Sequence, residues 1–169
     1  MENKEKLNEA SLGRIYQHIQ KEKVDSWSIL TSWRDENSPN KNKSDFNELK
    51  NKIRSMNLGF IQLQGVGQEE DEEGKVTQVK EPSLFIPNIK QKQAQKLSDT
   101  YKQWGYIYSG PETNDKIVLI SKEGQQNIGA FHPQKIAQFF SKIKGKPFTF
   151  EGVEPTTYME KYWKYLVNK

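Results

Sequence analysis

Residues 58–88 join two strand-like segments through an acidic turn. The first segment, 59–64, alternates apolar and polar side chains as a half-buried strand does. The second segment ends in the apolar run 84–86, which Pro87 closes because proline cannot donate a backbone hydrogen bond to a neighbouring strand. Five consecutive acids stand between them at 69–73. The pattern predicts a β-hairpin against which the other elements pair or pack.

Apolar side chains recur at helical spacing in several other stretches. Asp45 and Glu48 have the spacing of a capping box at the start of one helix, and Asn88 and Gln91 have it at the start of another. Residues 34–44, before the first of these helices, are predicted to form a polar loop. The predicted helices are 11–21, the stretches between Asp45 and Gly59, between Asn88 and Gly105 and between Pro133 and Gly145, and 158–167.

Short runs rich in aromatic and β-branched residues predict four further strands, at 25–33, 106–108, 116–120 and 148–150. The predicted fold class is α+β, with a single mixed, largely antiparallel sheet and helices packed on it. Residues 1–10 are predicted to be a flexible N-terminus. Residues 11–169 are predicted to form one domain, because this length suffices to bury a core.

The charge of the chain is unevenly distributed. The five acids at 69–73 contribute −5 to a net charge of +4, so the rest of the chain carries +9. This asymmetry is compatible with an acidic partner such as nucleic acid. Only three of the 26 basic residues are arginines, the residue type best suited to bidentate contacts with phosphate or guanine. A lysine-rich solubilising surface explains the same composition.

The absence of cysteine excludes disulfides, thiolate catalysis and cysteine-ligated metals, and it favours a reducing cytoplasm. No apolar run approaches the roughly 20 residues that a membrane-spanning helix needs. The first six residues lack the apolar core of a signal peptide. We therefore expect a cytoplasmic protein without a membrane partner.

The sequence contains no recognisable catalytic constellation. Its two histidines are His18 and His132, and His132 directly precedes Pro133, where a helix start explains it better than a catalytic base. No His-Glu-x-x-His pattern is present. Consecutive acids on a hairpin tip point in diverging directions, unlike the spaced oxygen ligands of Ca²⁺ or Mg²⁺. We predict no catalytic residue, no metal ligand and no cofactor, and the question of enzyme activity stays open.

Polar residues around the apolar run 84–86 form a candidate ligand site. Glu81 and Ser83 stand at the entry to a strand that should be buried on one face, and a buried carboxylate requires a cation or hydrogen-bond donors. Arg34 leaves the end of a predicted neighbouring strand, so an Arg34–Glu81 contact is one hypothesis. A structural or surface ion pair is the alternative. The candidate ligand-binding residues are Arg34, Glu81, Ser83 and Gln103.

Two further surfaces are candidates for macromolecular partners. Lysines interleave with phenylalanines in 135–150, a pattern that can mark nucleic-acid binding by stacking, although Phe139 and Phe140 match a buried helical stripe. The predicted last helix has more aromatic side chains than one core covers, which indicates a protein interface. The nucleic-acid candidates are Lys135, Lys142, Lys144 and Lys146, and the interface candidates are Tyr158, Tyr162, Trp163 and Tyr165.

Five segments of the chain stand out together: Ser-Leu-Gly-Arg-Ile-Tyr-Gln-His (11–18), Ile-Leu-Thr-Ser-Trp-Arg (29–34), the hairpin before Glu-Pro-Ser-Leu (81–84), Tyr-Lys-Gln-Trp-Gly-Tyr-Ile-Tyr (101–108) and Phe-Ser-Lys-Ile-Lys-Gly-Lys-Pro-Phe-Thr-Phe (140–150). In this order they resemble small uncharacterised proteins that tailed bacteriophages and mobile elements encode. The resemblance implies expression in the cytoplasm of a bacterial host, or association with the virion. It carries over no catalytic residue.

The leading hypothesis from these observations is a non-enzymatic binding protein that engages a host or phage macromolecule, with a protein partner favoured. One alternative is a small enzyme or ligand-binding domain with a polar pocket around Arg34, Glu81 and Ser83. Another is a nucleic-acid-binding protein that uses the basic helix 135–146. The sequence gives neither the oligomeric state nor the strand order.

Overall fold

The computed structural model describes residues 14–15, 17–19, 24–129 and 148–150. Among them, seven strands form one sheet in the spatial order β6-β5-β4-β1-β3-β2-β7, and every neighbouring pair is antiparallel. The predicted α+β class with a single sheet is confirmed. The strands are β1 (Trp27–Leu30), β2 (Ile61–Glu70), β3 (Val76–Pro87), β4 (Gly105–Ser109), β5 (Ile117–Ser121), β6 (Gly124–Gly129) and β7 (Phe148–Phe150).

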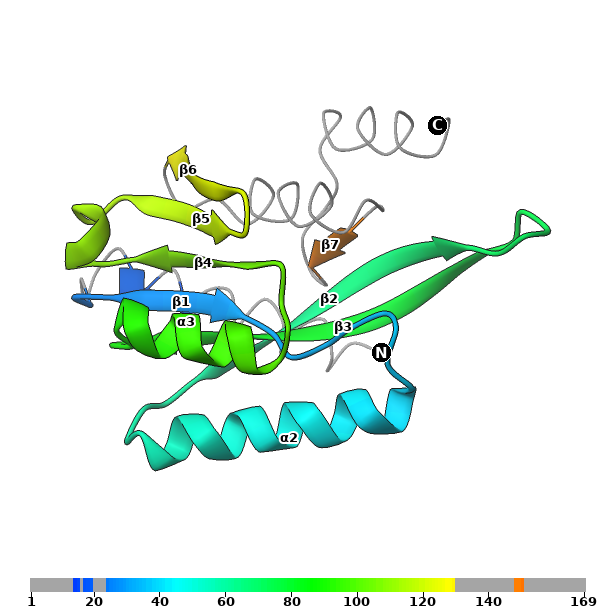
Figure 1. The fold of residues 1–169 in the computed structure, drawn as a ribbon, viewed down its shortest axis with the longest axis horizontal. Coiled ribbons are helices and arrows are strands. Elements are labelled where there is room, and N and C mark those ends of the chain that lie inside the picture. Colours follow the sequence, from blue (N-terminus) through cyan, green and yellow to red (C-terminus); the bar gives the residue numbers. More distant parts are fainter. Residues whose placement is uncertain (1–13, 16, 20–23, 130–147, 151–169) are drawn as a thin grey trace.

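The predicted hairpin is present as β2 and β3, whose register runs from Ile61 opposite Phe85 to Glu70 opposite Val76. Its turn is built by Asp71, whose Oδ1 accepts hydrogen bonds from the backbone N–H groups of Glu73 (2.9 Å) and Lys75 (2.8 Å). Gly74 supplies the left-handed backbone (φ 83°) that closes the turn. In Figure 1 the hairpin extends well past the other strands. Residues 69–78, which we call the acidic arm, are all exposed.

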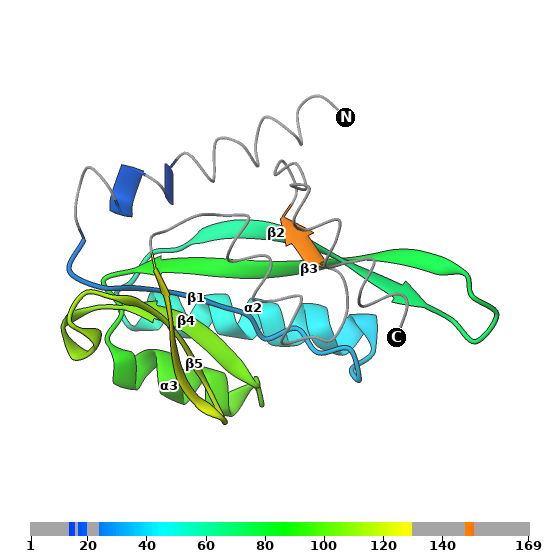
Figure 2. The same ribbon diagram turned by 90° about the horizontal axis from the view of Figure 1, so that it is seen from above.

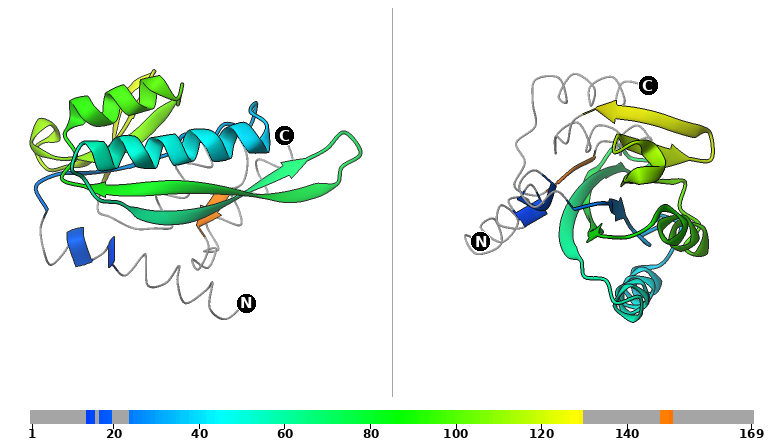
Figure 3. Two further views of the ribbon diagram at one scale, coloured as in Figure 1. Left: turned by 90° about the horizontal axis from the view of Figure 1, so that it is seen from below. Right: turned by 90° about the vertical axis from the view of Figure 1, so that its left-hand side faces the viewer.

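Two helices, α2 (Pro39–Ser55) and α3 (Gln91–Thr100), lie on one face of the sheet, and residues 14–15 and 17–19 lie on the other, as Figures 2 and 3 show. The helix predicted to begin at Asp45 in fact begins at Pro39, so the loop predicted over 34–44 is present only at 34–38, and the prediction is wrong for 39–44. Ser38 is the N-cap, and its hydroxyl oxygen accepts a hydrogen bond from the backbone of Lys41 at 3.2 Å.

The start and end of α3 also differ from the prediction. Lys90 rather than Asn88 is the N-cap, because Asn88 adopts a left-handed conformation (φ 66°) that turns the chain out of β3. The backbone N–H of Lys90 donates to Gln93 Oε1 at 2.9 Å. The helix ends at Thr100, and Gly105 is the first residue of β4. A short 3₁₀ helix, η1 (Pro111–Thr113), connects β4 to β5.

Alternation along β3 divides the core between the two faces of the sheet. Leu84 and Ile86 join the helix-side core under α2 and α3, whereas Phe85 belongs to the opposite-face core. All three side chains have no exposed surface. The helix-side core also contains Leu30, Phe46, Leu49, Ile53, Ala94, Leu97, Tyr101, Tyr106 and Tyr108. The opposite-face core also contains Ile15, Trp27, Ile29, Ile61, Leu63, Ile107 and Leu119.

Tyrosine hydroxyls connect the helices and η1 to their neighbours. Tyr106 on β4 donates to Gln95 of α3 at 2.8 Å, and Tyr108 donates to Glu112 of η1. Tyr101 donates to Glu48 of α2 at 3.0 Å. Burial is the main reason that the pKa of Tyr106 rises from 10.0 to about 12.

The described residues cover only part of the elements predicted near the two ends of the chain. Residues 14–15 and 17–19 are helical, within the helix predicted at 11–21. The predicted flexible segment 1–10 and the predicted helices beginning at Pro133 and at 158 lie outside the described residues. The strand predicted at 148–150 is present as β7, which pairs with 65–67 of β2.

We expect the Leu84→Ala substitution to lower the free energy of unfolding by about 2–5 kcal/mol, because it opens a cavity beneath two helices. Val76→Ala is the matched control, since Val76 on the same strand is 54% exposed and should change the value by less than about 1 kcal/mol. Urea denaturation measures both. Equal effects of the two substitutions would contradict the two-faced core.

We expect the free energy of unfolding to fall as the pH rises from 10.0 to about 12, in part because of Tyr106. Below this window the phenol is neutral in both states. Within it the unfolded chain loses the proton while the folded chain keeps it, so unfolding becomes more favourable. Urea denaturation across the window should show a shallower decline for Tyr106→Phe than for the unmodified protein. An identical decline would refute the assignment.

Candidate ligand-binding cleft

A cleft of about 300 Å³ lies where two distant segments of the chain approach each other. One wall is the segment 31–36 that leaves β1, and the other is the connection 102–105 between α3 and β4. Lys122, from the turn between β5 and β6, completes it. The cleft is lined by Trp33, Arg34, Asp35, Lys102, Gln103 and Trp104, among other residues.

Thr31 fixes the direction in which the first wall leaves the sheet. The last residue pair between β1 and β3 joins Leu30 to Leu84. Just beyond it, the Thr31 hydroxyl donates to the carbonyl of Pro82 at 2.7 Å and accepts from the backbone N–H of Trp33 at 3.0 Å. Proline at 82 offers no N–H with which to continue the ladder. A side chain therefore replaces the backbone pairing at this point.

Asn42 holds the backbone of Arg34 by both of its polar groups. The Arg34 N–H donates to Asn42 Oδ1 at 3.0 Å, and Asn42 Nδ2 donates to the Arg34 carbonyl at 2.8 Å. Asn37 Nδ2 donates to the same Oδ1 at 3.3 Å. Asn42 is only 3% exposed, so losing the bond that its Nδ2 donates would leave a buried polar group unsatisfied. The position of the first wall depends on this amide.

Gln103 connects the two walls. Its backbone N–H donates to the carbonyl of Ser98 in the last turn of α3, at 2.9 Å. Its side-chain Nε2 donates to the carbonyl of Trp33 at 3.2 Å and to that of Tyr101 at 3.3 Å. Lys102, just before it, adopts a left-handed conformation (φ 52°) that turns the chain from helix to strand.

The charged groups of the cleft have both signs. Arg34, whose side chain is 30% exposed, forms an ion pair with Glu36, whose side chain is 67% exposed. Lys102 and Lys122 are exposed cations on the same cleft. Because an exposed ion pair is worth only about 0–1 kcal/mol, Glu36 holds the guanidinium weakly. A stronger anionic partner can displace it.

Three carboxylates, of Asp35, Glu69 and Glu81, have oxygens within 4.8 Å of one another. The two glutamates lie on the same face of the hairpin, where Gly65 stands opposite Glu81 and Gly67 stands opposite Val79, so on β2 no side chain lies between Glu69 and the position opposite Glu81. Glu81 is 2% exposed. Each of the three makes further interactions within the structure. The cluster has the chemistry of a cation site, but its members are engaged, and we do not assign a metal to it.

The structure brings some of the four predicted ligand-binding residues to the cleft, but not all of them. Arg34 and Gln103 line the cleft itself. Glu81 joins it indirectly through the carboxylate cluster that it shares with Asp35. Ser83 is buried at 3% exposure, two residues farther along β3, and does not line the cleft. Arg34 forms its ion pair with Glu36 rather than with Glu81.

Sequence reasoning missed Trp33 and Asn42. The predicted loop 34–44 includes Asn42, although this residue precedes Phe46, Leu49 and Ile53 at helical spacing and shares their buried face. The predicted nucleic-acid residues Lys135, Lys142, Lys144 and Lys146 lie outside the described residues. The same holds for the predicted interface residues Tyr158, Tyr162, Trp163 and Tyr165.

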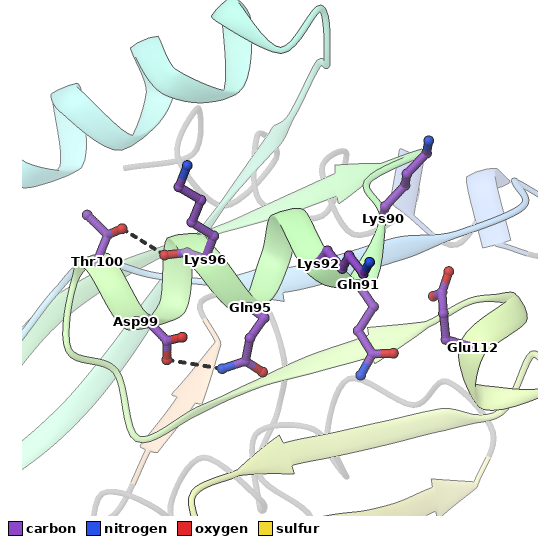
Figure 4. Close-up of a pocket in the computed structure, with 8 residues that line it drawn as sticks. All are labelled: Lys90, Gln91, Lys92, Gln95, Lys96, Asp99, Thr100 and Glu112. Atoms are coloured by element: carbon purple, nitrogen blue, oxygen red, sulfur yellow. Dashed lines mark hydrogen bonds between the residues drawn. The ribbon is translucent and has the colours of Figure 1, made fainter.

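A larger groove of about 780 Å³ runs along the outer side of α3, as Figure 4 shows. Its lining comes from one helix and Glu112 of η1, and it includes Lys90, Lys92 and Lys96 together with Asp99. Gln95 donates to Asp99 at 3.0 Å and accepts from Tyr106 at 2.8 Å, so two of its polar side chains already satisfy one another. The smaller cleft is the better candidate site, because buried side chains hold its walls.

Comparison with protein-family models, with curated protein sequences and with solved structures finds no match for this chain. The resemblance to phage-encoded proteins therefore stays a prediction. Within the described residues, no helix is long and apolar enough to cross a membrane.

We expect Asn42→Ala to lower the free energy of unfolding by about 1–3 kcal/mol, because it removes the side-chain acceptor of the Arg34 N–H and one of the two donors to the Arg34 carbonyl, which keeps only the backbone N–H of Asn37 at 3.2 Å. Hydrogen exchange at the Arg34 amide should become faster in the same variant. Asn47→Ala is the matched control, since Asn47 is an exposed position on the same helix. If Asn42→Ala leaves the Arg34 exchange rate unchanged, Asn42 does not hold this wall.

Proposed function

We propose that this protein is a ligand-binding domain whose cleft between 31–36 and 102–105 receives an anionic group. The observation that carries the proposal is that three cations from separate segments, Arg34, Lys102 and Lys122, line one cleft whose backbone is held by buried side chains. Few, pre-positioned polar groups in a concavity are the usual architecture of a ligand site.

Arg34 is the residue best suited to hold such an anion. A guanidinium presents a planar set of donors that match a carboxylate or phosphate in a bidentate manner. Its backbone is fixed by Asn42, so the side chain starts from a defined position. The guanidinium forms an ion pair with Glu36. Because the Glu36 side chain is 67% exposed, it can turn away into solvent at little cost in free energy when a ligand binds.

Ligand binding without catalysis is the simpler form of this proposal. The Asp35–Glu69–Glu81 cluster is adjacent, but its carboxylates are engaged in other interactions. A cytoplasmic location, expected from the absence of cysteine, belongs to the same proposal. The phage resemblance would make the ligand a molecule of the infected cell or of the virus.

To test this proposal, we would titrate the protein with inorganic phosphate and with citrate by calorimetry. We expect Arg34→Ala to weaken binding of the tighter anion about 10- to 100-fold, as for loss of hydrogen bonds to a charged group. Arg54→Ala, on the exposed side of α2, should leave the affinity unchanged. Failure of both anions to bind, or equal effects of the two substitutions, would contradict the proposal.

The acidic arm favours a second candidate function, binding of a basic protein. Its residues 69–78 are exposed along both strands, and its tip carries five consecutive acids out of the 22 acidic residues of the chain. Isolated two-stranded ribbons are only marginally stable in water, so an arm of this length is suited to becoming ordered against a partner. This candidate retains the protein partner that the sequence favours.

The arm can be neutralised without breaking its turn. Replacing Glu70, Glu72 and Glu73 by glutamine keeps Asp71, whose carboxylate builds the turn. We expect this variant to lose at least half of its binding to polylysine at low salt, and the unmodified protein to lose binding as salt is raised. Glu123→Gln, an exposed acid in another turn, is the control. Unchanged polylysine binding would remove the second candidate.

A further inference from the structure

We infer that the ligand of the cleft is a nucleotide unit, with its phosphate at the cations and its base on Trp33. This inference rests on the proposed function and adds the chemical class of the ligand. The same unit can be a free mononucleotide or one residue of a single strand. What distinguishes it from a simple anion is an aromatic ring that requires stacking.

Two tryptophans line the cleft together with its three cations. Trp104 packs against the opposite-face core and forms part of the supporting wall. Trp33 belongs to neither core cluster of the described residues and is partly exposed. Its backbone is nevertheless held at both ends, because its N–H donates to Thr31 and its carbonyl accepts from Gln103. A fixed backbone with a ring outside the core is what a stacking platform requires.

The cations are placed for a phosphate beside such a ring. Arg34 follows Trp33 directly, and Lys102 and Lys122 come from the other side of the cleft. Gln103 uses its Nε2 to hold two carbonyls, which leaves its side-chain oxygen to accept a hydrogen bond from a base amino group. Stacking, phosphate contacts and one amide acceptor together describe nucleotide recognition with weak base preference.

The volume of the cleft limits how much of a nucleic acid it can take. At about 300 Å³ it lies at the lower end of ligand-site volumes, which run from about 300 to 1,000 Å³. That space suits a single nucleotide. A longer strand would have to continue outside the cleft, over the surface.

The test compares three probes on the full chain by calorimetry: adenosine monophosphate, adenosine and inorganic phosphate. We expect adenosine monophosphate to bind at least about 10-fold more tightly than either half, since it makes both sets of contacts. An oligothymidylate is titrated in parallel. Tighter binding of the oligonucleotide, weakening with salt, identifies a strand as the source, and tighter binding of the mononucleotide identifies a free nucleotide.

Substitutions at Trp33 separate stacking from charge. Trp33→Leu should weaken binding of adenosine monophosphate about 5- to 100-fold and leave inorganic phosphate binding unchanged. Trp33→Phe, which keeps a ring, should restore most of the affinity and also guards against misfolding of the leucine variant. Lys116→Ala, an exposed cation outside the cleft, should change neither.

The two levels of the proposal fail in different ways. If inorganic phosphate binds and depends on Arg34, but adenosine monophosphate binds no more tightly and ignores Trp33, the nucleotide inference is overturned and anion binding stands. If adenosine binds as tightly as its monophosphate, or if no probe binds, the anion-binding function itself is overturned.

Discussion

The burial of β3 on both faces is the constraint on which the rest of the structure depends. Leu84 and Ile86 are completely covered on the helix side, and Phe85 between them is completely covered on the other. A slip of one residue in the pairing with β1 or β2 would exchange these faces, so the register is strongly determined. Because the register of β3 is determined, so are the positions along it of the last residues of β1 and of the start of the acidic arm.

The cleft follows from what happens where this pairing stops. Beyond Leu30 the chain leaves the sheet, and its backbone is held by hydrogen bonds from side chains instead of by pairing with a neighbouring strand. Thr31 binds the carbonyl of Pro82, Asn42 binds both backbone groups of Arg34, and Gln103 joins the facing wall. These bonds are buried or partly buried, where an unsatisfied partner is costly, so the two walls are held in one arrangement. The cleft therefore exists because the hydroxyl of Thr31 and the side-chain amides of Asn42 and Gln103 hold the segment that follows β1.

The sequence predicted the hairpin, a single and largely antiparallel sheet, and the helical faces, because alternation and helical periodicity are local patterns that burial enforces. It also predicted a mixed sheet, whereas every described strand pair is antiparallel. It misplaced the start of α2, where Ser38 and Pro39 are a strong helix start that the Asp45–Glu48 pattern obscured. That error hid Asn42, which looks like a loop residue unless the helix begins before it. Arg34 and Gln103 are predicted ligand-binding residues because they stand at the ends of predicted elements. Their shared cleft, however, depends on a contact between segments about 70 residues apart, such as the hydrogen bond from Gln103 to Trp33, and no local pattern encodes such a contact.

The central claim is that the cleft between 31–36 and 102–105, rather than the larger groove on α3 or the acidic arm, is where this protein binds its ligand. An NMR titration with adenosine monophosphate tests it most directly, because backbone amide signals report contact residue by residue. The account predicts that the signals of 33–36 and 102–105 shift together and saturably, while those of 91–100 and 69–78 stay in place. Shifts confined to 91–100, or spread evenly over the exposed lysines, would contradict it.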